Sequence, residues 1–117
     1  MPQVSKLNPR ITIWSRCREW RQTQLKSLYE ASMLDEDDDE GMDRVARLAD
    51  ANMKDIEDAL IEAAYGMTSI DDVQSILGIA LALLKEGLTD RAKPLLHAIH
   101  RGCNGVRNAH HKEAEAA

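Results

Sequence analysis

The stretch from residue 69 to 88, SIDDVQSILGIALALLKEGL, constrains the fold more than any other part of the chain. On a helical wheel its apolar side chains cover an arc of about 200°, which is wider than the stripe that a helix lying on one neighbour needs. Ser69 is a suitable N-cap and Gly87 a suitable C-terminal stop. We therefore predict a central helix packed on two sides, and its small, uncharged polar residues indicate no chemistry there.

The chain is short and poor in aromatic residues. It has 117 residues, no phenylalanine, two tryptophans and two tyrosines, so an aliphatic core is expected, which suits helices better than a β-sandwich. We predict an all-α fold, a small bundle of about four helices in which the last two form an antiparallel hairpin. The expected organisation is a disordered start over residues 1–8, a single bundle domain over 9–108 and a frayed tail over 109–117.

Apolar periodicity predicts two helices before the central one. The first is expected over roughly residues 10–33. The second, over roughly 39–65, has the cleanest pattern in the chain, with apolar side chains on one arc and charged side chains, Glu57 among them, on the other. Asn52 interrupts the apolar side, either to fix the register of packing or because it reaches water at the edge.

The last predicted helix contains two glycines, Gly102 and Gly105, which weaken helices. We expect it to end near Arg101 and to resume as a short piece. Within residues 76–101, small and large side chains recur at helical spacing, at Ile79, Ala80, Leu83, Gly87, Ala92 and Leu96. This spacing resembles one helical hairpin of the tetratricopeptide repeat family. The resemblance implies an antiparallel hairpin and no particular ligand, and no second copy is evident.

Charge is distributed unevenly along the chain. Residues 1–29 carry six basic side chains and one acidic, whereas residues 30–62 carry thirteen acidic and three basic. We expect these segments to attract one another, inside the fold or across a dimer, or to form a surface for a charged partner. The acidic run 35–40 is expected to be a solvated loop that leads into a helix, because it lacks the ligand spacing of a calcium-binding loop.

The first helix carries the strongest signal for binding. Trp14, Arg18, Trp20 and Arg21 fall within its apolar half. The arginine stems either cover apolar surface while the guanidinium groups reach water, or the guanidinium groups pair with carboxylates of a neighbouring helix or a partner. Because tryptophan and arginine dominate protein interfaces, we predict that all four residues bind a partner and that the protein self-associates through this helix.

The last helix supplies a second group of polar residues. His97 and His100 stand one turn apart, a spacing that can hold a transition metal, with Arg101 and Arg107 alongside. We predict that these four residues bind a partner and that the protein holds no metal or cofactor, since a convincing third ligand is lacking. Neither cysteine has a base beside it in the sequence, and no phosphate-binding loop or nucleophile motif occurs, so we predict no catalytic activity.

Elimination leaves binding as the expected function. We predict a small intracellular, cytoplasmic protein-interaction module, a regulator or adaptor that forms a homodimer. The alternative is a nucleic-acid-binding regulator that uses the basic first helix and the His/Arg face of the last helix. No membrane span is expected, because the longest apolar run, residues 79–84, is far shorter than the ~20 residues that cross a bilayer.

Overall fold

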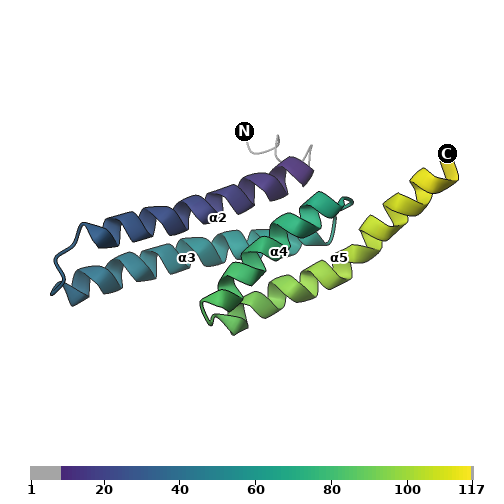
Figure 1. Cartoon of the computed structure of the whole chain (residues 1–117). Helices are drawn as coiled ribbons and strands as arrows, with labels where there is room; N and C mark the ends of the chain where they lie inside the picture. The colour runs from purple at the N-terminus through teal and green to yellow at the C-terminus, as the bar shows by residue number, and fades with distance from the viewer. Residues whose placement is uncertain (1–8, 117) are drawn as a thin grey trace.

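The computed structural model describes the backbone of residues 9–116 and the side chains of residues 13–109. Within that part, the fold consists of four helices in the order α2 (Pro9–Ser32), α3 (Asp39–Ala64), α4 (Ile70–Lys85) and α5 (Thr89–Ala116), without strands. The predicted all-α bundle is therefore confirmed. Figure 1 shows α2 and α3 lying side by side along their length, with α4 and α5 packed over one half of that pair.

The helix ends are fixed by the local interactions that the sequence suggests. The hydroxyl of Ser69 accepts a hydrogen bond of 3.2 Å from the backbone N–H of Asp72, which caps α4. Gly87 adopts a φ of 80°, the left-handed conformation that glycine reaches without strain. The backbone N–H of Leu88 then donates to the carbonyl of Leu83 at 2.9 Å, so α4 ends in a Schellman motif. Figure 1 shows α4 and α5 extending from this turn toward the same side of the molecule, so the direction of the chain reverses between them.

The core lies where the four helices meet. Helix α4 packs against α5 on one side and α2 on the other, which agrees with the predicted two-sided central helix. The ends of its apolar arc remain uncovered, however, since Ile70 and Leu81 are exposed. The fully buried large side chains of the core are Ile13, Trp20, Leu60, Met67, Ile76, Ile79, Leu83 and Leu95.

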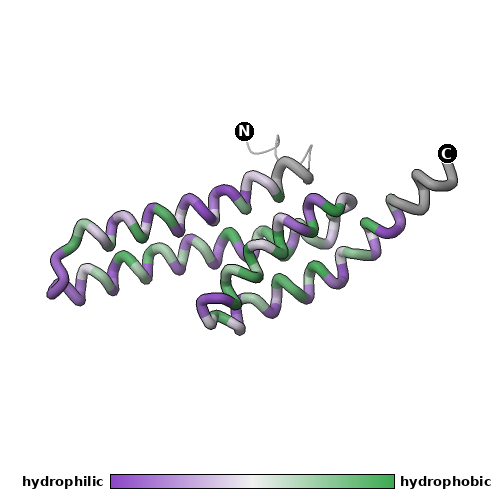
Figure 2. Tube along the Cα trace, viewed as in Figure 1, coloured by the Kyte–Doolittle hydropathy of each residue, from purple (hydrophilic) through white to green (hydrophobic). Residues whose placement is uncertain are grey.

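One end of the α2/α3 pair extends beyond the other two helices. Between residues 21 and 48, which we call the arm, Gly41 is the only buried residue. The connection between the two helices carries the acidic run, is exposed as predicted, and is strongly hydrophilic at the tip in Figure 2. Asp38 caps α3 by accepting a hydrogen bond of 2.9 Å from the backbone N–H of Gly41. The arm is therefore two helices thick.

Helix α5 differs from the prediction. It continues through Gly102 and Gly105 to Ala116 instead of ending near Arg101. Gly102 lies against the end of α3, because a Cβ there would overlap the carbonyl of Ala64, and Gly105 lies against the connection that follows, where a Cβ would come within 2.7 Å of the carbonyl oxygen of Met67. Close packing between the helices thus offsets the low helix propensity of glycine. The segment expected to be a frayed tail is helical as far as residue 116, and the predicted disordered start, residues 1–8, lies outside the described residues.

Candidate functional site

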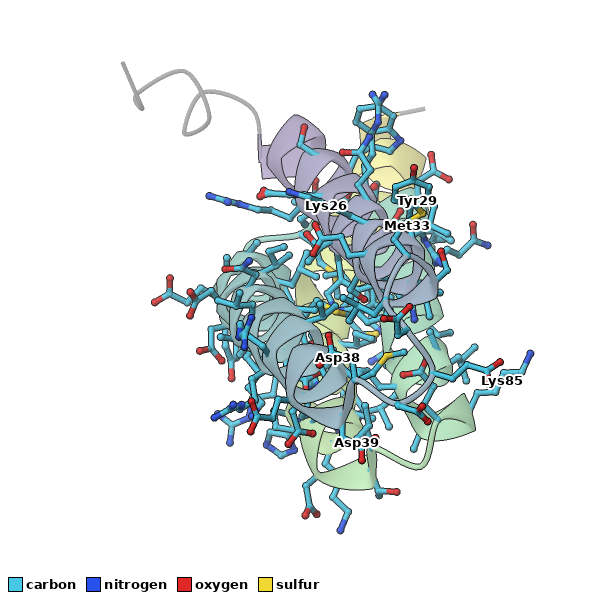
Figure 3. The ribbon with its side chains drawn as sticks, turned by 90° about the vertical axis from the view of Figure 1, so that its left-hand side faces the viewer. Lys26, Tyr29, Met33, Asp38, Asp39 and Lys85 are labelled. Atoms are coloured by element: carbon cyan, nitrogen blue, oxygen red, sulfur yellow. The ribbon has the colours of Figure 1, made fainter. Side chains whose placement is uncertain are left out.

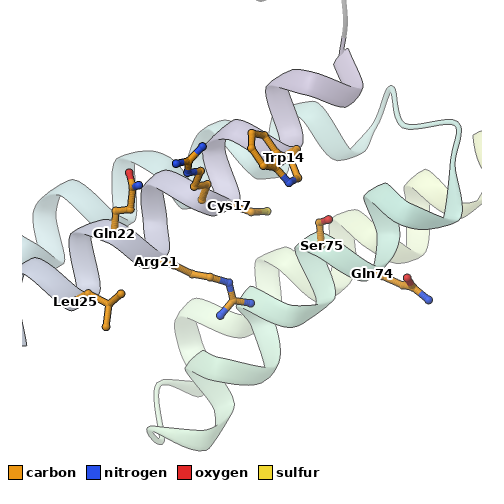
Figure 4. Close-up of a pocket in the computed structure, with 8 residues that line it drawn as sticks. Trp14, Cys17, Arg21, Gln22, Leu25, Gln74 and Ser75 are labelled. Carbon is orange, nitrogen blue, oxygen red and sulfur yellow. The ribbon is translucent and has the colours of Figure 1, made fainter.

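A groove of about 450 Å³ runs between α2 and α4, and we call it the α2/α4 groove. Figure 4 shows it from the side, with α2 along one wall and α4 along the other. Three of the four residues predicted on the first helix line it together. The lining side chains are Trp14, Cys17, Arg18, Arg21, Gln22 and Leu25 from α2, and Gln74 and Ser75 from α4.

Trp14 and Arg18 form a pair at one end of the groove. The guanidinium carbon of Arg18 lies 5.4 Å from the centroid of the Trp14 ring, within the range of a cation–π contact. Trp14 itself is 56 % exposed. The contact orients the guanidinium group while leaving most of the ring open to solvent.

Arg21 reaches across the groove from α2 toward α4 (Figure 4). Its guanidinium lies over Gly78, where a Cβ would come within 3.0 Å of an arginine Nη atom. The absence of a side chain at residue 78 therefore gives Arg21 room to cross. Among the described residues, no carboxylate forms an ion pair with Arg21 or with Arg18, so both charges are available at the groove surface.

Cys17 forms the buried floor of the groove. Burial raises the pKa of its thiol to about 11; the positive charge of Arg21 lowers it in part and the negative charge of Asp72 raises it further. The thiol is therefore protonated near neutral pH, which does not suit a nucleophile. Cys103 of α5, in contrast, is exposed.

Trp20, the fourth predicted residue of the first helix, is fully buried. Its indole N–H donates a hydrogen bond of 2.8 Å to Glu57 of α3. The prediction that Trp20 binds a partner at the surface is therefore wrong, because the ring completes the core of the monomer. On α2 the two tryptophans lie about 120° apart around the axis, and only one of these directions faces α3.

Sequence reasoning also missed the carboxylate that receives this hydrogen bond. Glu57 is 3 % exposed, and Arg91 of α5 donates to both of its oxygens, at 3.0 Å and 2.6 Å. Arg91 also donates to Asp50 at 3.2 Å. The hydrogen bond with Glu57, ahead of the other effects, raises the pKa of Arg91. Glu57 therefore joins α2, α3 and α5 at one buried point.

The histidines predicted on the last helix lie on the other flank of the bundle. His97 and His100 line an open depression of about 750 Å³ between α3 and α5, together with Ile61, Tyr65, Lys93, Pro94 and Leu96. Arg101 and Arg107 are exposed farther along α5. Because α2 and α5 are diagonal neighbours without mutual contact in the described bundle, the structure does not bring the two predicted clusters together.

Comparison with known proteins finds no protein-family model, no curated protein and no solved structure that the chain matches. Over the part that the structure describes, no group of three or more His, Cys, Asp or Glu side chains is arranged to hold a metal ion. No helix in the same part is both long and apolar enough to cross a membrane. The α2/α4 groove offers an aromatic face, two guanidinium groups and several amide and hydroxyl groups.

Proposed function

We propose that the protein is a non-catalytic protein-interaction module, a regulator or adaptor, whose α2/α4 groove binds an acidic, amphipathic segment. The observation that carries this proposal is the placement of Arg18 and Arg21, which have no carboxylate partner among the described side chains, beside exposed apolar surface at Trp14 and Leu25. A ligand that fits must supply carboxylates and apolar groups at close spacing.

The physical case rests on the groove side chains. Arginine binds carboxylates through a planar group with paired donors, and tryptophan contributes a large contact area with little loss of conformational freedom. Because Arg18 already lies on Trp14, binding would immobilise less of its side chain than it would for a freely moving arginine. These features match the small set of residues that carry most of the energy in protein interfaces.

Two observations favour binding of a protein over the nucleic-acid alternative. The His/Arg face that the alternative requires lies on the opposite flank from Arg18 and Arg21. In addition, the groove provides two guanidinium groups, whereas nucleic-acid binding commonly neutralises many phosphates. A short acidic segment fits both the number of charges and the apolar surface between them.

Selection from a displayed library of random 16-residue peptides tests the proposal. We expect the selected sequences to combine Asp or Glu with large apolar residues. Their affinity should fall at least tenfold in Arg18→Ala/Arg21→Ala, as expected for the loss of a few kcal/mol. The matched control is Arg44→Ala/Arg47→Ala, which removes two exposed arginines at the same spacing from α3 and should leave affinity within about twofold.

Two results would contradict the proposal. One is selection of peptides without acidic residues, and the other is equal loss of affinity in both double variants. Binding of duplex DNA that weakens about a thousandfold between 50 and 200 mM salt would instead support the nucleic-acid alternative.

A further inference from the structure

We infer that the occupant of the α2/α4 groove is a second copy of this chain, bound with its α2 antiparallel, so that the acidic run 35–40 of each copy lies against Trp14, Arg18 and Arg21 of the other. The inference rests on the proposed function, since it names the partner of the same groove. The argument combines an exposed apolar stripe, a separation of charges along one helix and the thinness of the arm.

The exposed stripe starts in the groove and continues onto the arm. Five of the ten large apolar side chains exposed in the described residues belong to residues 14–33: Trp14, Leu25, Leu28, Tyr29 and Met33. Spacings of three and four residues place the first four, with Arg18 and Arg21, along one side of α2, and Met33 follows directly after the helix. In Figure 3 Tyr29 and Met33 lie on the same side of the bundle as Lys85 of α4. Such a stripe resembles one face of a helix–helix interface.

Arg18 and the acidic run 35–40 lie too far apart to pair within one chain. Arg18 and Arg21 lie near the middle of α2, whereas the acidic run follows its end. At 1.5 Å per residue, about 20 Å of helix separates Arg18 from the start of the run, which is beyond the reach of any side chain. Pairing of Arg18 with the acidic run 35–40 can therefore occur only between molecules.

An antiparallel arrangement brings the opposite charges together. If two copies of α2 cross midway between Leu25 and Tyr29, residues whose numbers add up to about 54 lie opposite one another, so Leu25 faces Tyr29. Arg21 then faces Met33, next to the acidic run, and Arg18 lies level with the run itself. A two-fold axis repeats each of these contacts. The stripe is thus complementary to itself in charge as well as apolar surface.

The arm gives a second reason for such an interface. Residues 21–48 bury no large apolar side chain, and Leu25, Leu28 and Tyr29 are each more than 60 % exposed. The α2/α3 pair of a second copy, laid along the stripe, would give this end of the molecule the third and fourth helices that the other end already has in α4 and α5. Burial of apolar surface would then support both parts of the bundle.

A charge-swap experiment tests the inference. Sedimentation velocity between about 1 and 200 µM, a range covering modest dimer affinities, is measured on the full chain. We expect the unaltered chain to form dimers and two variants each to remain monomeric: Arg18→Glu/Arg21→Glu and Asp35→Lys/Glu36→Lys/Asp37→Lys. An equimolar mixture of the two variants should form heterodimers, because residues 18 and 21 of each copy again lie near residues 35–37 of opposite charge in the other. Asp38 is left unchanged because it caps α3.

A control variant and two contrary outcomes complete this experiment. Arg44→Glu/Arg47→Glu should dimerise like the unaltered chain, and circular dichroism should show the same helix content for every variant. A monomeric unaltered chain at 200 µM, or variants that fail to pair when mixed, would overturn the inference. The groove itself is tested separately by repeating the peptide selection on the Lys triple variant, whose groove is free. If acidic peptides bind to this variant, the proposed function is supported even when the unaltered chain does not form dimers.

Discussion

Glu57 joins three helices through a single carboxylate. It accepts hydrogen bonds from Trp20 of α2 and from Arg91 of α5, and the described side chains leave no buried polar atom without a partner. A buried ion pair often adds little to stability relative to apolar residues of the same shape, but removal of one member leaves an uncompensated charge. We therefore expect Glu57 to favour one arrangement of the three helices.

Replacement of Glu57 by glutamine should destabilise the protein by about 3 kcal/mol, because Arg91 would lose its buried counter-charge. Urea denaturation followed by circular dichroism measures the change. Asp58→Asn is the matched control, since that neighbouring carboxylate is exposed, and it should change the free energy of unfolding by less than about 0.5 kcal/mol. If both variants lost similar amounts of stability, the buried carboxylate of Glu57 would contribute no more to stability than the exposed carboxylate of Asp58.

The two cysteines should differ in reactivity. Cys103 is exposed, whereas Cys17 is buried with its pKa raised to about 11. At pH 8 a thiol reagent such as dithionitrobenzoate should label one cysteine rapidly and the second only after unfolding. Cys103→Ser should abolish the rapid phase, and Cys17→Ser should preserve it. Rapid labelling of two thiols in the folded chain would contradict the burial of Cys17.

The raised pKa of Cys17 also sets a dependence of stability on pH. Its thiol ionises near 9.0 when unperturbed and near 11 in the folded chain, so its contribution is complete below pH 9 and is lost as the pH rises toward 11. Measured by urea denaturation, the unaltered chain should lose more stability than Cys17→Ser across this interval. Equal losses in the two proteins would exclude the effect.

At the level of residues, the sequence predicted the groove better than the core network. Trp14, Arg18 and Arg21 share one helical arc, so their convergence follows from spacing alone. The placement of Trp20 depends on the position of α3 relative to α2, which no single-helix pattern contains. Glu57 did leave a signal, because it continues the buried series Met53, Leu60 and Ala64 at spacings of four, three and four residues. Its charge led to its assignment to the outer arc.

Among the helices, the packing of α5 on the end of α3 depends on residues without side chains. Gly102→Ala should destabilise the protein by about 1–3 kcal/mol, because the new Cβ would overlap the carbonyl of Ala64. Helix propensity alone predicts the opposite, a gain of about 1 kcal/mol. Gly66→Ala is the control: its Cβ would lie 3.8 Å from the nearest atom outside its neighbours. Thermal unfolding distinguishes the two predictions.

The helix ends show which local sequence patterns are sufficient to predict where a helix begins or ends. Helix α3 begins at the predicted residue 39 and ends one residue earlier than predicted, and the cap at Ser69 and the stop at Gly87 lie where the sequence placed them. These ends depend on hydrogen bonds within a few residues. The end of α5 could not be predicted in this way, because a contact with a distant helix supports the two glycines there. The resemblance to a tetratricopeptide hairpin stays a prediction about spacing.

For the whole molecule, stability should be distributed unevenly. The half that contains α4 and α5 holds nearly all of the buried side chains, whereas the arm consists of two helices. Backbone amides in residues 21–32 and 39–48 should therefore exchange with deuterium much faster than those in 76–83 and 92–99. If the antiparallel dimer forms, exchange in residues 21–32 should slow as the protein concentration increases. Uniform protection in a dilute sample would contradict this division of the fold.

The contrasting positions of the two tryptophans equip the molecule with two independent optical reporters. Trp20, enclosed in the core, should emit at short wavelength and resist quenching until the chain unfolds. Trp14, 56 % exposed beside a guanidinium group, should emit at long wavelength and be quenched more by iodide than by caesium, since the nearby charge attracts the anion. Trp20→Phe and Trp14→Phe separate the signals, so occupancy of the groove can be followed by loss of iodide quenching without interference from folding.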